Sequence, residues 1–509
     1  MTTTIKDTSI SRRALFGTAA AAIGCLLAPA RALAEDAVSA DSGTLGDYPA
    51  NVMAFSMADD GRGYPYYTTD AAIQAGYEGK VIYLNVDWLF TGTMTVADSK
   101  SLTIDMNGHK IENLGDGAVI RLYENSSLTL CSNVPDVATT FYYKGFDAAT
   151  GDVMDASVIA GGLVTGGSNT YGGAFRMDNK STLTLDNVAV AGNHAKQGGG
   201  IYAKENCNIY VKNGASIRHN RTYRGGGIYV NQDDTNIFMD NGFISDNHAY
   251  QCGGGIYSDD NGTRVHLENK SSICGNCAES DGGGLYFYQS WLNVVSDDGT
   301  GSVSGNTAEG SGGGIYIDPV QTATHTTSGS LTGLTISENV ANGEGGGGVY
   351  QGQKDIEIVN CTITENYGSN GGGVYFNCFS AVINGCTITE NTCGVRGVGG
   401  GVTSYCRVTS SLFTLCGVCQ IKDNTRGKYG SDDDFFFSAS SYSHLSAYIC
   451  ITGGVDQGSH VGVRTDVDGN QPLGRKITTF YEGTYFMNTD GYQILHDDEG
   501  EMWQAKIKY

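Results

Sequence analysis

Short stretches in which apolar and polar residues alternate recur along most of this chain. Residues 183–185, 209–211, 237–239, 265–267 and 356–358 each place two apolar side chains on either side of a residue that points the other way. An alternation of period two predicts strands with one buried face, and no stretch in this region shows the period of an amphipathic helix. The chain is therefore predicted to be all-β, with about three short strands and three turns in each repeat.

A glycine cluster marks each repeat. It consists of three glycines, an aliphatic residue and a tyrosine, as at residues 198–202, and it recurs roughly every 25 to 35 residues, a spacing typical of solenoid proteins. Degenerate copies lie at residues 172–175 and 399–403. The tyrosines that end the full clusters are Tyr202, Tyr229, Tyr257, Tyr286, Tyr316, Tyr350 and Tyr375.

A second signature lies just upstream of each glycine cluster. It consists of an aliphatic residue followed three positions later by asparagine, as in Ile217 and Asn220. The asparagines in phase are Asn193, Asn220, Asn247, Asn276, Asn306, Asn339, Asn366, Asn391 and Asn424. An asparagine at a buried turn can donate its amide to the asparagine of the next coil and to backbone carbonyls, so a structural ladder is expected.

One repeat cannot bury its own apolar face, but a stack of repeats can. The pattern therefore predicts a single-stranded right-handed parallel β-helix, a solenoid whose equivalent residues are about 4.8 Å apart. A leucine-rich repeat is the alternative solenoid. It is not supported, because no Leu-x-x-Leu-x-Leu pattern appears.

The paired motifs also carry a resemblance over roughly residues 70–470. Gly-Gly-Gly-aliphatic and aliphatic-x-x-Asn resemble the repeats of polymorphic outer-membrane proteins and similar bacterial surface β-helices of pectin lyase-like fold, although Ile or Val stands where that family usually has Phe. The resemblance implies the fold and a place at the cell surface. It implies little about activity.

The two ends of the chain differ from the repeats and suggest four segments. Residues 1–34 contain twin arginines, an apolar run and a small-residue cleavage site, which indicate a twin-arginine export signal. Residues 35–76 are expected to form an N-terminal segment and cap with a short helix starting near Thr68. The β-helix is placed at 77–430, and a C-terminal β cap at 431–509. No later apolar stretch is long enough to span a bilayer, so no membrane insertion is expected after signal removal.

The charge of the chain narrows the class of partner. It carries 54 acidic and 31 basic residues, a formal net charge of −23. Such a charge repels the phosphates of nucleic acid, so no nucleic-acid partner is expected. It suits a protein that stays soluble outside the cell, in the extracellular space or at the cell surface.

Candidate metal sites are few. The Cys274/Cys277 and Cys416/Cys419 pairs could suggest zinc, but five coils, or about 24 Å, separate them. The acidic residues Asp233, Asp234, Asp259, Asp260 and Asp318 match no dedicated calcium-loop motif, so no cofactor is predicted and calcium stays as an alternative. Cys361 and Cys386 precede identical segments, which leaves open both a stack of thiols and a bridge.

The seven tyrosines form the candidate binding site. Each follows an inward-facing aliphatic residue, so alternation directs its side chain outward. Two interpretations follow: the tyrosines stack on one another, or they contact a glycan or a surface protein of a host or neighbour. No catalytic residue is predicted, because no paired-carboxylate motif is present. The sequence therefore favours an exported, non-catalytic adhesion or binding scaffold; a glycan-active β-helix enzyme, either lyase or hydrolase, is the alternative.

Overall fold

The computed structural model divides the chain into two compact units, Met1–Asp47 and Tyr48–Tyr509. It describes only residues of the second unit. The described residues are 51–57, 63–132, 139–232, 234–259, 262–288, 292–318, 329–352, 356–377, 380–406, 412–427, 431–432, 435–439, 448–451, 460–465, 477–478, 485–488, 492–496 and 501–506. The predicted export signal lies outside them.

Most coils of the second unit contain four strands, whereas the first described coils contain three. In one coil these are β15 (Thr182–Asp186), β16 (Val188–Ala191), β17 (His194–Gln197) and β18 (Ile201–Ala203). The expected number was about three. The additional strand is the third one, which lies between the ladder asparagine and the glycine cluster, as β17 does between Asn193 and Gly198.

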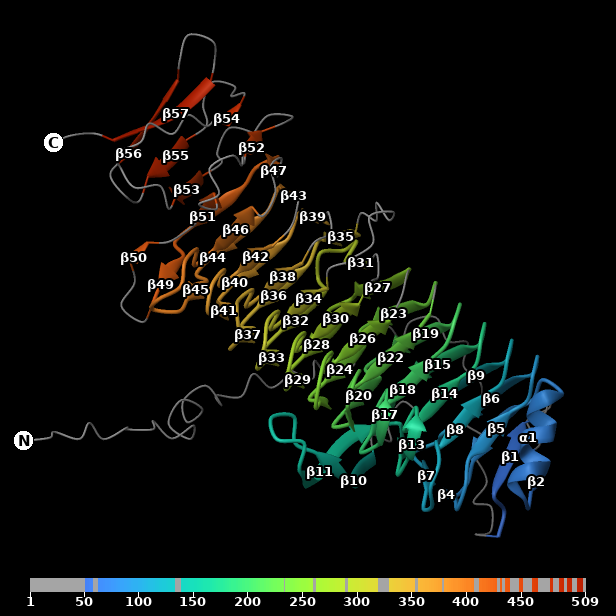
Figure 1. The fold of residues 1–509 in the computed structure, drawn as a ribbon. Coiled ribbons are helices and arrows are strands. Elements are labelled where there is room, and N and C mark those ends of the chain that lie inside the picture. Colours follow the sequence, from blue (N-terminus) through green and yellow to red (C-terminus); the bar gives the residue numbers. More distant parts are fainter. Residues whose placement is uncertain are drawn as a thin grey trace, which may run out of the picture. The chain divides into compact units, whose positions relative to one another are not determined.

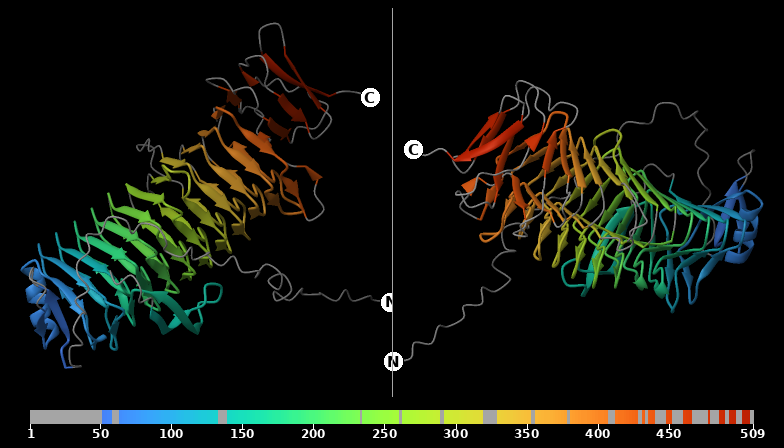
Figure 2. Two further views of the ribbon diagram at one scale, coloured as in Figure 1. Left: turned by 180° about the vertical axis from the view of Figure 1, so that it is seen from behind. Right: turned by 45° about the horizontal axis from the view of Figure 1, so that its top comes forward.

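Equivalent strands of successive coils lie side by side (Figures 1 and 2). They pair in parallel and form four ladders. The stack has about ten turns, and the predicted right-handed parallel β-helix is confirmed. The first ladder runs from β3 (Val81–Leu84) to β52 (Tyr448–Ile451), and the second from β4 (Trp88–Phe90) to β53 (His460–Thr465). The third ladder runs from β13 (Ser168–Tyr171) to β49 (Thr425–Arg426). The fourth runs from β5 (Met94–Val96) to β51 (Phe435–Ala439).

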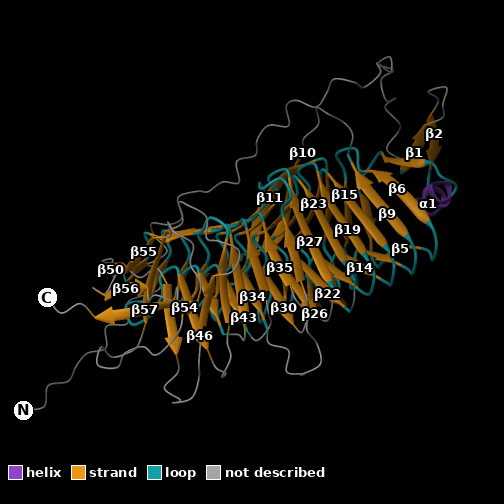
Figure 3. Ribbon diagram, turned by 90° about the horizontal axis from the view of Figure 1, so that it is seen from above, coloured by secondary structure: helices purple, strands orange, loops and turns teal. Residues whose placement is uncertain are grey.

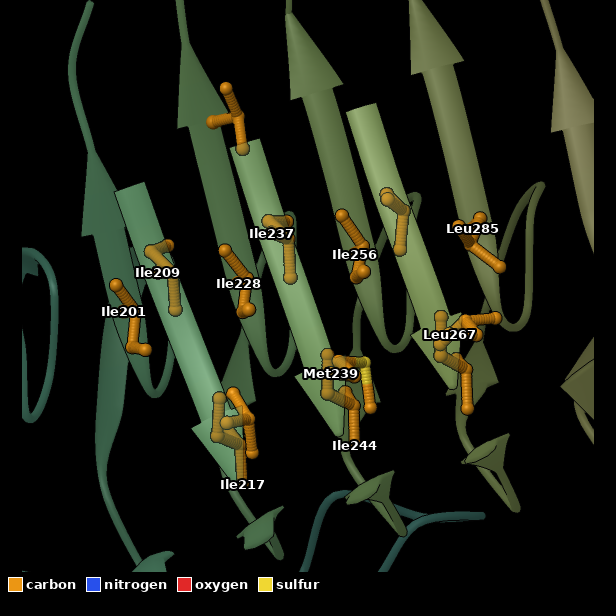
Figure 4. Close-up of a cluster of buried hydrophobic side chains, with 14 of the residues drawn as sticks. Ile201, Ile209, Ile217, Ile228, Ile237, Met239, Ile244, Ile256, Leu267 and Leu285 are labelled. Atoms are coloured by element: carbon orange, nitrogen blue, oxygen red, sulfur yellow. The ribbon is translucent and has the colours of Figure 1, made fainter. Parts of the chain in front are cut away.

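Aliphatic side chains fill the interior of the coils. Ile201, Ile228, Ile256 and Leu285 lie in direct register, each fully buried beneath the next (Figure 4). Burying one such side chain contributes about 1.5–3 kcal/mol. The interior is one continuous core, so each coil is stabilised mainly by its neighbours.

The asparagines form the predicted ladder, and all nine are buried. Nδ2 of Asn220 donates to Oδ1 of Asn247 at 3.0 Å and to the carbonyl of Val190 in the preceding coil at 3.0 Å. The backbone N–H of Asn220 donates to the same oxygen at 3.1 Å. The corresponding bond joins every successive pair from Asn193 to Asn424. The buried amides are thus satisfied by one another and by the backbone, as expected.

The N-terminal end carries the predicted helical cap. Helix α1 (Thr69–Tyr77) begins after Thr68, whose hydroxyl accepts a hydrogen bond from the N–H of Ala71. Gly76 is packed so closely on Leu102 that a Cβ there would lie 2.2 Å from its side chain. Helix α1 therefore lies directly on the first coils (Figure 3).

Strands that run against the solenoid direction lie at both ends. At the N-terminal end β1 (Ala54–Met57) pairs antiparallel with both β2 (Gly63–Tyr66) and β3. In the C-terminal part, β56 (Tyr492–His496) and β57 (Glu501–Lys506) form an antiparallel pair. Such strands cover open sheet edges, which would otherwise invite association.

One element was not predicted. Between β9 (Ser127–Cys131) and β12 (Gly162–Thr165), where most coils have a tight corner, the chain forms the antiparallel hairpin of β10 (Thr139–Phe146) and β11 (Val153–Ala160). This hairpin packs on the outside of the coils (Figure 1). Its alternating pattern resembles that of the solenoid strands, so the sequence offered no signal that it leaves the stack.

Candidate functional site

The seven tyrosines lie in the middle of strands of the fourth ladder. Tyr229, Tyr257 and Tyr286 are held in direct register by β22 (Ile228–Asn231), β26 (Ile256–Asp259) and β30 (Leu285–Tyr288). The tyrosines in these coils form a cluster separate from the main core. Their side chains therefore lie on the outer side of the strands, as the alternation predicted.

The rings stack face to face along the solenoid. From Tyr202 to Tyr375, successive ring centroids are 4.7–5.5 Å apart and successive ring planes differ by 2–14°. Tyr316 keeps partial exposure, and the other six side chains are no more than 8% exposed. Because each ring covers the faces of its neighbours, a ligand can reach only the outer edge of the column.

Three of the hydroxyl groups have polar partners at that edge. Tyr229 donates to Asp259 at 2.7 Å, Tyr286 donates to Asp318 at 3.1 Å, and Tyr350 accepts from Asn377 at 3.2 Å. Burial raises the pKa of Tyr229, and the hydrogen bond to Asp259 raises it further. Burial also raises the pKa of Tyr202, to about 12. The edge therefore presents neutral phenols beside carboxylates at neutral pH.

The tyrosine column continues into two arginines at its N-terminal end. Arg176 lies in register with Tyr202, and Arg121 with Arg176. Asp178 binds both the guanidinium of Arg121, at 2.7 Å, and the amine of Lys204, at 2.8 Å. Burial alone would raise the pKa of Asp178, but hydrogen bonds from Lys204 and Arg121 hold it below its usual value. The column thus ends in a buried carboxylate ringed by cations.

Sequence reasoning missed this charged cluster, although a signal was present. Arg176 follows Phe175 in the degenerate glycine cluster, at the position that tyrosine takes in later coils. The partner Asp178 lies two residues further on, on the same outer face of the strand. The sequence spacing therefore placed Arg176 in the column, but Arg121 belongs to a coil that lacks the glycine motif.

The candidate metal ligands are dispersed. Asp233 and Asp260 lie outside the described residues, whereas Asp259 and Asp318 bind tyrosine hydroxyls. In the described part of the chain, no group of three or more His, Cys, Asp or Glu side chains is placed to hold a metal ion.

Cys361 and Cys386, the pair in equivalent segments, are both thiols. Cys361 and Cys386 stack in the core, with the backbone nitrogen of Cys361 3.4 Å from Sγ of Cys386. Of the two arrangements left open for this pair, the structure has the stack. Burial raises the pKa of Cys419, which follows in the next coil.

Comparison with known proteins found no match: no family model, no curated protein and no solved structure resembled the chain closely enough to be retained. Among the described residues, no helix is long and apolar enough to cross a membrane.

Proposed function

We propose that this protein is exported by the twin-arginine route and acts outside the cell, free or at the cell surface, as a non-catalytic scaffold that binds a glycan or a neighbouring surface protein. We further propose that its repeats are of the polymorphic outer-membrane protein kind. The observation that carries the binding proposal is the tyrosine column, which repeats one side chain in register over seven coils.

The column suits an extended ligand that lies along the solenoid axis. Successive strands hold the tyrosine edges at a fixed repeat of about 4.8 Å, so a polymer with regularly spaced hydroxyl or amide groups meets the edge of a phenol ring at each coil. The stacked rings and the buried asparagines keep these edges in place before binding. Preorganisation of this kind lowers the entropic cost of association.

The centre of the column and its N-terminal end differ in charge, and this difference would orient such a ligand. Asp259 and Asp318 lie beside the central tyrosines, whereas Arg121 and Arg176 extend the column at its N-terminal end. A ligand with one anionic end would place that end toward the arginines, and its hydroxyl groups along the tyrosines. Complementarity of this kind fixes register more than it adds affinity.

The test removes the hydroxyl groups and keeps the stack. A variant with Tyr286→Phe, Tyr316→Phe and Tyr350→Phe should lose at least about tenfold in affinity for the glycan or cell surface found by array screening, the cost of one or two hydrogen bonds. Its denaturation midpoint should stay close to that of the unchanged protein. Tyr210→Phe is the matched control, because Tyr210 stacks on Phe238 on a different ladder. Equal binding by the triple variant would rule out the column as the contact surface.

A further inference from the structure

The hairpin β10–β11 has an apolar underside that rests on the solenoid. Phe141, Tyr143 and Val158 pack against Leu163 and Ala189 in a cluster separate from the main core. The solenoid strand beneath, β16, contributes the small side chains of Ala189 and Ala191 to this cluster. Ala189 stands in register with Leu163 of the preceding coil and Ser216 of the next. This part of the surface is therefore shaped to receive the hairpin.

Polar contacts from two successive coils hold the hairpin in place. Oη of Tyr143 lies 2.7 Å from Nδ1 of His219, and the N–H of Phe146 donates to the carbonyl of His219 at 3.2 Å. At the hairpin tip, His248 donates from Nδ1 to the carbonyl of Ala148 at 2.8 Å. The third contact comes from the guanidinium of Arg221, which donates to the carbonyl of Gly151 at 2.9 Å and lies 4.2 Å from the ring of Phe146.

The charged and titratable groups that face His219 come from its own coil, from the next coil and from the hairpin. Arg218 is its neighbour in the chain and pairs with Asp246 of the next coil at 3.2 Å. Tyr143 and Asp147 approach from the hairpin. A proton added to His219 would place a second positive charge beside Arg218 in a site that the hairpin shields from water.

His194 is in a comparable position one coil earlier. The ring of Phe146 from the hairpin packs edge-on at 5.9 Å, and Nε2 of His194 lies 3.0 Å from Oγ of Ser168 in the preceding coil. The nearby charges are Arg221 of the next coil and Asp116.

His248 differs from both. Its Nδ1 keeps the bond to Ala148 whether or not the ring is charged, and its Nε2 lies 3.6 Å from Glu279. Tyr250 lies edge-on at 4.7 Å, and Cys277 is the next residue in the ladder. Because both forms of the ring can donate to Ala148, this contact does not oppose acid.

We propose that the hairpin β10–β11 is an acid-sensitive arm, which rests on the solenoid at neutral pH and loosens from it as the pH falls. His219 and His194 are the groups that sense the proton. The contacts made by His248 and Arg221 persist in acid, so the tip of the hairpin stays bound to the solenoid. The part of the hairpin around Tyr143 is the part that loosens.

The direction follows from the two histidines. Burial, followed by repulsion from Arg218, lowers the pKa of His219 from 6.5 to about 4. Burial and then Arg221 lower the pKa of His194. Both histidines are neutral while the hairpin is docked, and their pKa values return toward the ordinary value once the hairpin is released. Docking is therefore fully stabilised above the ordinary pKa of about 6.5 and is weakened as the pH falls from there through about 4.

Hydrogen exchange followed by mass spectrometry tests this on the full chain. Protection factors, which correct for the intrinsic pH dependence of exchange, should fall at least about tenfold for peptides of residues 139–160 between about pH 7.5 and about pH 4.5. Peptides covering residues 302–304 and 335–337 provide the internal reference, because these strands lie in distant coils. A fall of the same size in those peptides would mean global loosening and would overturn the proposal.

Two variants separate the histidines from other acid effects. His219→Asn suits the left-handed φ of 51° at this position, and His194→Gln keeps an amide near Ser168. The double variant should keep its hairpin protection at about pH 4.5. If the hairpin of the double variant is already unprotected at neutral pH, the proposal is tested by the pH profile of the unchanged protein. Hairpin protection in the unchanged protein that stays constant down to about pH 4.5 would show that the arm does not respond to acid.

Discussion

Asn247 donates twice to a single oxygen of Asn276, from Nδ2 at 2.9 Å and from its backbone nitrogen at 3.1 Å. Asn247 is in turn the acceptor for both donors of Asn220. Replacing Asn247 by alanine therefore removes the acceptor of the buried backbone N–H of Asn220 and the donor to the carbonyl of Ile217, whereas Asn276 keeps its bond from the backbone N–H of residue 247. Asn247→Ala should lower the free energy of unfolding by about 1–3 kcal/mol or more, as measured by denaturant titration.

Asn342→Ala is the control for this change, because Asn342 is exposed. Its midpoint should stay within about 0.5 kcal/mol of the unchanged protein. Equal midpoints for the two variants would mean that the ladder does not contribute to stability.

Glycines of the clusters lie much closer to neighbouring backbone than a glycine such as Gly92 does. A Cβ on Gly283 would lie 2.5 Å from the carbonyl oxygens of both Gly313 and Thr307, whereas one on Gly92 would meet nothing within 4 Å. Gly283→Ala should cost about 1–3 kcal/mol or more, because the contacting atoms are backbone and cannot move aside cheaply. Gly92→Ala should be neutral within about 1 kcal/mol. Thermal unfolding of the two variants side by side measures the difference.

High pH should weaken the fold through the tyrosine column. Burial raises the pKa of Tyr257 and Tyr286 well above 10.0 in the folded protein. A raised pKa means that the neutral phenol is the form that stabilises the fold, so stability is complete below the unfolded value of about 10 and is lost as the pH rises above it. Each such tyrosine should remove up to about 1.4 kcal/mol per pH unit above about pH 10.

Denaturant midpoints at about pH 8 and about pH 10.5 measure this loss, and absorbance near the phenolate band shows when ionisation occurs. A variant with Tyr257→Phe and Tyr286→Phe should lose less stability over the same range. Phenols of the column that ionise near pH 10 without unfolding would contradict the buried, stacked arrangement.

Export depends on the twin arginines if the signal is of the predicted type. Arg12→Lys combined with Arg13→Lys should retain the protein inside the producing cell, as judged by fractionation and immunoblotting. The control is Lys6→Arg, which keeps the charge outside the arginine pair. Normal secretion of the double variant would exclude this route.

Much of the fold could be predicted from the sequence because the two repeated motifs show which residues of successive coils are equivalent. Ile217 and Asn220 recur at fixed separation, which places one in the core and the other at a corner in every coil. The additional strand of most coils was harder to predict, because a strand as short as β21 (Arg221–Thr222) shows no alternation. The hairpin β10–β11 was missed because period-two alternation does not say which face of a strand meets the stack.

The candidate site could be predicted only in part. Alternation correctly directs Tyr257 and Tyr286 outward, but it cannot show that each ring will cover the next. The degree of burial depends on ring orientation across coils, which no local pattern encodes. The same holds for Asp178, whose partners Arg121 and Lys204 come from the coils on either side of it.

The direct register between coils makes the length of the molecule adjustable. Ile256 and Leu285 occupy equivalent positions in successive coils. Removing residues 256–284 would therefore join Gly255 directly to Leu285, and the new junction would again be three glycines followed by an aliphatic residue. Recombination between repeats can therefore shorten or lengthen the gene by whole coils and leave each remaining junction intact. Variants of this protein that differ in length by whole coils could arise without any new folding problem to solve.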